Sequence, residues 1–82
     1  IFQMKNKVKL KDSPERIFDL LIEWMVSLGA SKTAIKAVVI LLPTPEQRYR
    51  LMEWISKTME DHEPTEGEIV EQAMLISDEI EN

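Results

Sequence analysis

The side chains best suited to chemistry in this sequence surround its single histidine, His62. Asp61 and Glu63 flank it, and these three residue types can hold a cation or move a proton. The chain has one histidine and no cysteine, so it cannot build a zinc site of several such ligands by itself, and we expect no catalytic triad. Three consecutive loop residues rarely converge on one ion, so we expect a solvated polar loop at this position.

Two other patterns that can mark enzymes have simpler explanations here. Glu66 and Glu68 stand at a predicted helix start, where the helix dipole stabilises acids. Nucleotide-binding loops of the GxGxxG or GxxxxGK type are excluded, because Gly29 and Gly67 are the only glycines. The sequence therefore predicts a noncatalytic protein, without a cofactor or a bound metal, that acts by binding.

Length and composition predict one small folded domain. A chain of 82 residues with 44% apolar and 30% charged residues is typical of a globular protein with a thin core. Residues 1–3 precede Met4, which can start translation, so we interpret them as the remnant of a cleavable tag and residues 4–82 as the domain. The lack of cysteine agrees with a reducing compartment, and we expect a cytoplasmic protein. No apolar stretch approaches the roughly 20 residues that cross a bilayer, so we expect no membrane insertion.

The charges are divided unevenly along the chain. Residues 1–50 hold nine basic and five acidic side chains, whereas residues 51–82 hold one lysine and ten acids, which together give a net charge of −5. This division indicates a basic contact surface and an acidic solvating one. Charges that simply line solvated helix faces would give the same counts, and that alternative stays open.

Helix start and stop signals divide the chain into four helical segments. Each start has a serine or threonine that can cap free amide groups, and two starts continue with proline and glutamate. Gly29 and Pro43 stop the first two helices. Apolar residues recur at helical spacing, which predicts an all-α four-helix domain of two αα-hairpins on a shared core. The predicted helices cover about residues 14–28, 31–42, 45–59 and 66–80.

Spacings of three and four residues identify candidate core positions in the later helices. In the third helix a buried face is expected with Tyr49 and Trp54 at its flanks. The two halves of the chain also resemble one another, because the segment from Ser13 to Trp24 is echoed from Thr44 to Trp54 with one residue deleted. An internal repeat and a coincidence between capped helices are both consistent with this. The expected core residues are Leu51, Met52, Ile55 and Met59 in the third helix and Ile69, Val70, Ala73, Met74, Ile76 and Ile80 in the fourth.

The second predicted helix carries the strongest indication of an interface. Its second half, Ala37 to Leu42, is apolar all round, which places it in the middle of a bundle or in a dimer interface. A buried strand is the alternative for this short run. The two tryptophans stand at equivalent points of the two hairpins, as core anchors or as contacts to a partner. The residues expected at a protein interface are Trp24, Val38, Ile40, Leu41 and Trp54.

A basic segment precedes the first helix. Between Met4 and Lys11 every second residue is a lysine, which places all of them on one face if the segment is an extended arm or a short strand. Such a strand, a helix that starts with Pro14-Glu15 and a second helix opened by Gly29-Ala30-Ser31 resemble the ribbon-helix-helix group of DNA-binding repressors and antitoxins. The resemblance covers residues 5–42.

This resemblance implies a pair of chains whose strands enter the major groove, with the start of the second helix on phosphate. Lys36 falls where the family tends to be apolar. The stretch from Trp24 to Lys36 also resembles a helix-turn-helix, with Met25 where a small residue is expected. Carried over, the DNA contacts are Lys5, Lys7, Lys9, Lys11, Ser31 and Lys32.

Two functions from different classes are consistent with the sequence. The first is a noncatalytic helical interaction module that self-associates as a dimer or docks a protein partner through its second helix and its tryptophan-bearing faces. The alternative is a DNA-binding transcriptional regulator or antitoxin-like protein with a basic N-terminal arm and an acidic C-terminal half. Salt-dependent binding to duplex DNA would separate them.

Overall fold

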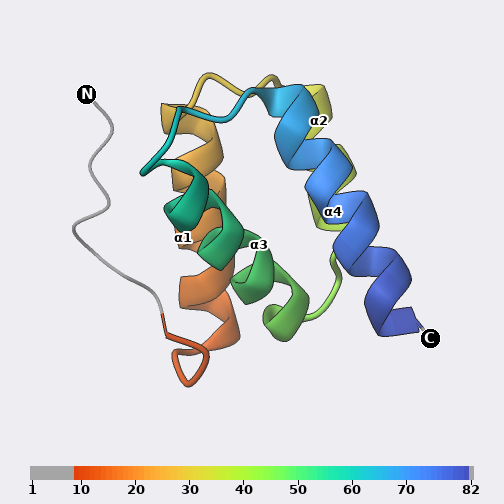
Figure 1. Cartoon of the computed structure of the whole chain (residues 1–82). Helices are drawn as coiled ribbons and strands as arrows, with labels where there is room; N and C mark the ends of the chain where they lie inside the picture. Colours follow the sequence, from red (N-terminus) through yellow and green to blue (C-terminus); the bar gives the residue numbers. More distant parts are fainter. Residues whose placement is uncertain (1–8, 82) are drawn as a thin grey trace.

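A computed structural model of the chain describes residues 9–81 and confirms the all-α fold. Helix α1 spans Pro14–Ser27, α2 spans Lys32–Leu41, α3 spans Pro45–Thr58 and α4 spans Glu66–Glu81 (Figure 1). Each helix ends within one residue of its predicted bounds. The apolar run that starts at Ala37 is helical as far as Leu41, so the buried strand considered as its alternative is wrong.

The first helix begins and ends as its residues predict. Ser13 Oγ accepts a hydrogen bond of 3.2 Å from the Arg16 amide, and Pro14 occupies the first turn, where no amide donor is missed. Gly29 follows the helix with a φ of 84°, a left-handed conformation that glycine adopts without a steric penalty. The chain therefore leaves α1 in a tight turn that leads directly to α2.

At the starts of α3 and α4 the predicted threonine caps form capping boxes, in which the threonine exchanges hydrogen bonds with the residue three positions later. The Gln47 amide donates to Thr44 Oγ1 at 3.2 Å, and the Thr44 amide donates to the Gln47 side chain at 3.1 Å. Thr65 and Glu68 repeat this exchange at α4, with distances of 2.9 and 3.2 Å. Each box satisfies amide groups that have no partner inside the helix, which fixes where α3 and α4 begin.

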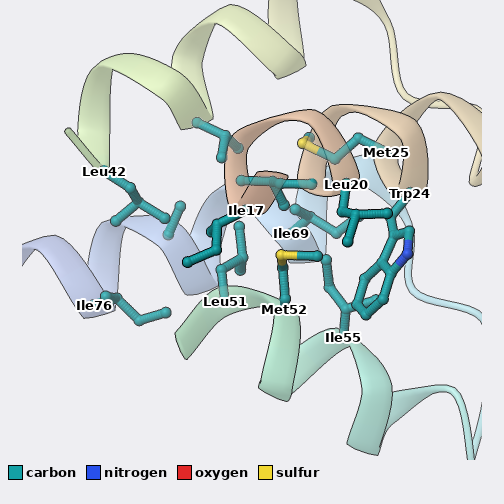
Figure 2. Packing of buried hydrophobic residues seen from close by; sticks show 13 residues of the cluster. Ile17, Leu20, Trp24, Met25, Leu42, Leu51, Met52, Ile55, Ile69 and Ile76 are labelled. Atoms are coloured by element: carbon teal, nitrogen blue, oxygen red, sulfur yellow. The ribbon is translucent and has the colours of Figure 1, made fainter. Parts of the chain in front are cut away.

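One hydrophobic core joins the four helices. Its residues recur every three or four positions, so they form one face of each helix, and Figure 2 shows these faces turned toward one another. Helix α2 has 10 residues, fewer than an isolated helix needs in water, so its conformation depends on this burial. The buried core consists of Ile17, Leu20, Leu21, Trp24, Met25, Val38, Leu42, Leu51, Met52, Ile55, Ile69, Ala73 and Ile76.

The helices pack across the two halves of the chain. Among the described residues the close pairs are α1 with α3, α3 with α4, and α2 with α4. Helix α1 therefore packs more extensively on α3 than on α2, its neighbour in the sequence. Helices α2 and α4 run side by side from the same end of the molecule (Figure 1). At that end the Ser31 amide before α2 donates a hydrogen bond of 2.7 Å to the Glu66 carboxylate at the start of α4.

The basic segment before α1 is not a strand in the part that the structure describes. The Asp12 amide donates to the Lys9 carbonyl at 2.9 Å, and the Lys9 amide donates to the Asp12 carboxylate at 2.8 Å. These two hydrogen bonds close a turn that contains Lys11, because a short acidic side chain competes with extended structure for backbone amides. The rest of the predicted arm, with Lys5 and Lys7, lies outside the described residues.

Candidate functional site

The structure separates the five residues expected at a protein interface. Trp24 is 5% exposed and Val38 is fully buried, so both belong to the core. Leu41 and Trp54 are half-buried and pack against that core. Ile40 is 78% exposed, although it lies only two residues from Val38. Two residues correspond to about 200° around a helix, so these two side chains point in nearly opposite directions.

An open hollow of about 580 Å³ lies between α2 and α4. Ala34 and Ala37 form its α2 side, where their small side chains leave space, and Val70 and Met74 form its α4 side. Its lining is mostly apolar. A surface with this shape and polarity fits apolar side chains of another molecule better than it fits water.

Exposed apolar side chains accompany this hollow along both helices. Met74, which lines it, and Leu75 are about half exposed, and Ile40 follows Ala37 by one helical turn. The prediction that Met74 is buried is therefore wrong, because its spacing from Val70 fits either edge of the apolar stripe of α4. We call this surface the α2–α4 face, and it comprises Lys36, Ala37, Ile40, Val70, Glu71, Met74 and Leu75.

The two helices of this face carry opposite charges. Helix α2 contains Lys32 and Lys36 and no acid, whereas α4 contains six acids and no base. Some of these acids have partners inside the fold, such as Glu79, which pairs with Arg50 of α3 at 2.8 Å. Lys36 and Glu71 are exposed and form no ion pair within the described part of the chain. Two opposite charges on the face are therefore available to another molecule.

A second hollow, of about 400 Å³, lies over α3, and we call it the tryptophan hollow. Trp24, Tyr49 and Trp54 line it with aromatic rings that also pack on the core. Glu53 and Lys57 line it too, four residues apart on the same helix, a spacing at which opposite charges attract. This region combines buried aromatic surface with two acids, Glu53 and Glu60, and one base, Lys57.

Among the described residues, those proposed to contact DNA do not lie on one surface. Lys9 and Lys11 lie before α1, whereas Ser31 and Lys32 lie beyond its far end (Figure 1). The Ser31 amide, where the resemblance places a phosphate, already donates to the carboxylate of Glu66. An acid of the chain itself thus occupies the start of α2.

His62 connects the loop after α3 to the start of α4. Its Nδ1 lies 2.9 Å from Asp61 Oδ2, and its Nε2 lies 3.1 Å from Glu68 Oε2. The hydrogen bond with Asp61 and then that with Glu68 raise the pKa of His62. The Thr65 amide, and then His62, lower the pKa of Glu68. Within residues 9–81 no group of three or more candidate ligands could hold a metal ion, so this arrangement joins two segments of the chain.

No family model matches the sequence, and comparisons with curated proteins and with solved structures likewise found no match. Over the described part of the chain, no helix combines the length and the hydropathy needed to cross a membrane.

Proposed function

We propose that this chain is a noncatalytic interaction module whose contact surface is the α2–α4 face. The proposal rests on the exposure of Ile40. This side chain is 78% exposed and lies one helical turn after Ala37, which lines the hollow together with Met74. Apolar surface left in water costs about 25 cal/mol for each Å², a cost that a partner removes by covering it. Clusters of exposed apolar side chains are typical of such contact surfaces.

The composition of the α2–α4 face fits a protein partner. Protein interfaces have an apolar centre and a polar rim. Ile40 and Met74 supply the centre, and Lys36 and Glu71 supply charges beside it. A small-molecule site would enclose its ligand and direct several polar groups at it, whereas this hollow is open and mostly apolar.

The side chains best suited to catalysis support a noncatalytic role. His62 and Glu68 hold one another at the surface, and Asp61 occupies the other ring nitrogen of the histidine. These contacts link two chain segments, and this structural role explains why the three side chains lie together without any need for a catalytic role.

Site-specific photocrosslinking in the native host tests the proposal. A benzophenone amino acid at position 40 should form covalent adducts with a protein, which mass spectrometry then identifies. The same probe in place of Lys57, beside the tryptophan hollow, is the matched control and should form few adducts. A folded variant that carries the probe at position 40 and gives no protein adduct would contradict the proposal.

DNA binding is the alternative function, and its own test is the effect of salt. A protein that neutralises phosphates loses affinity for duplex DNA steeply as salt rises. In a DNA-binding protein, Lys9→Ala combined with Lys11→Ala would lower both the affinity and this salt dependence. We expect no measurable salt-dependent binding of this chain to duplex DNA.

A further inference from the structure

The α2–α4 face has the same order of side chains on both of its helices. Helices α2 and α4 start near the same level, since the Ser31 amide donates to the Glu66 carboxylate and the starts of both helices line the same hollow. Both helices rise about 1.5 Å per residue. Five residues beyond these positions stand Lys36 on α2 and Glu71 on α4. Both are exposed, so the face carries a positive charge on α2 and a negative charge on α4 at about the same level.

The apolar side chains repeat this correspondence. Nine residues beyond Ser31 and Glu66 stand Ile40 on α2 and Leu75 on α4, and both are exposed. Each follows a charged residue of its own helix by four positions and shares a helix face with it. The α2–α4 face therefore presents two parallel stripes, each with a charge followed by an apolar side chain, and the two stripes have opposite charges.

Two orientations of a twofold axis align the helices of two copies across this face. An axis perpendicular to the helices would place α2 on α2 and α4 on α4, so that the basic helix meets a basic helix and the acidic helix meets an acidic one. An axis parallel to the helices places α2 on α4 of the other copy, at the same level. Like charges at an interface cost free energy and opposite charges select the correct register, which favours the parallel axis.

We propose that the partner bound by the α2–α4 face is a second copy of this chain, related by a twofold axis parallel to α2 and α4. This inference rests on the proposed function, because it names the partner of that same surface. Lys36 faces Glu71 of the partner subunit, and Ile40 faces Leu75 of the partner subunit. Symmetry makes each contact occur twice, so the surface satisfies its own charges and covers its own apolar side chains.

Sedimentation equilibrium of the full chain, at concentrations from about 1 μM to about 1 mM, measures the dimer dissociation constant Kd. We expect a monomer–dimer equilibrium in this range. Ile40→Asp should raise Kd by about a hundredfold or more, because it places a charge twice in the apolar centre of the interface. Circular dichroism should show an unchanged helix content, since Ile40 does not contribute to the core.

A charge exchange tests the pairing of α2 with α4. Lys36→Glu and Glu71→Lys, each alone, should raise Kd by about tenfold, because each turns two attractions into repulsions. The variant that carries both changes should return to within about threefold of the original Kd. Lys57→Glu and Glu53→Lys make the same changes of charge on α3, outside the face, and should leave Kd within about threefold of its original value.

The outcomes separate this inference from the proposed function. A chain that stays monomeric throughout the concentration range overturns the second copy as partner. Adducts of position 40 with a different protein would in that case leave the proposed function in place, whereas a folded probe variant without adducts would remove both. A dimer that Ile40→Asp leaves intact overturns the assigned surface, and a double variant that stays as weak as the single ones overturns the parallel axis.

Discussion

The tryptophan hollow and the α2–α4 face are both rich in apolar residues, but they differ in how far those side chains are buried. At the tryptophan hollow, the large side chain of Trp24 is buried and the aromatic rings pack on the core. At the α2–α4 face, Ile40 points into solvent beside a hollow bounded by small residues. Folding therefore buries the large apolar side chain of the first region and leaves apolar side chains of the second exposed to water.

The distribution of charge separates the two regions further. Beside the tryptophan hollow, Glu53 and Lys57 bring both signs to one helix at a spacing at which opposite charges attract, and Glu60 follows that helix. At the α2–α4 face the two signs stand on different helices, with Lys36 on α2 and Glu71 on α4. The proposed docking surface therefore differs from the tryptophan hollow in the exposure of its apolar side chains and in the placement of opposite charges on two helices.

The largest expected effect tests whether the tryptophan hollow belongs to the core. Trp24→Ala should lower the free energy of unfolding by about 3–5 kcal/mol, because it removes a large buried side chain and leaves a cavity. Urea denaturation followed by circular dichroism measures this loss. Trp54→Ala, at the equivalent but half-buried position, should cost less, and equal losses would contradict the distinction between the two sites.

Two alanine substitutions on α2, one at a buried residue and one at an exposed residue, test where the core ends and the α2–α4 face begins. Val38→Ala should cost about 2 kcal/mol of unfolding free energy, since Val38 is fully buried. Ile40→Ala should change it by no more than about 0.5 kcal/mol when measured in dilute solution, where the chain is monomeric. A large loss from Ile40→Ala under these conditions would place that residue in the core and remove the comparison.

A smaller effect is expected at the start of α3, the helix beneath the tryptophan hollow. Thr44→Ala removes the acceptor for the Gln47 amide and should lower the free energy of unfolding by about 1 kcal/mol. Thermal unfolding monitored by circular dichroism measures the change. Thr44→Ser keeps a hydroxyl in the capping position and should recover most of the loss, while Kd for association should not change in either variant.

The smallest effect is expected from His62, which touches α4 outside the face. Its pKa is raised in the folded chain, so it adds stability below its ordinary pKa of 6.5 and loses that contribution as pH rises through the raised value. Glu68 has a lowered pKa, so its contribution is present above its ordinary value of 4.5 and is lost as pH falls through the lowered one.

His62→Gln isolates the first of these effects. Urea denaturation at a series of pH values should show that the native chain loses its advantage over this variant as pH rises from below 6.5 to above the raised pKa. The difference is expected to be small because the contacts are exposed to solvent. A native chain whose advantage grows with pH would contradict the direction of the shift.

The sequence by itself determined where the helices begin and end. The capping box from Thr44 to Gln47 spans four residues, and Gly29 ends α1 through its own backbone conformation, so both signals are local in the sequence. The core face of α3 could also be predicted, because Leu51, Met52 and Ile55 stand on one side of a helix whose other side is polar.

Only the tertiary structure decided which apolar residues remain exposed. The end of α2 is apolar all round, so its sequence does not distinguish Val38 from Ile40, and only the positions of the other helices do. The register of α2 and α4 depends on a contact between Ser31 and Glu66, which are 35 residues apart. Patterns within one helix cannot encode such a contact, because it forms only when two distant segments have packed on a common core.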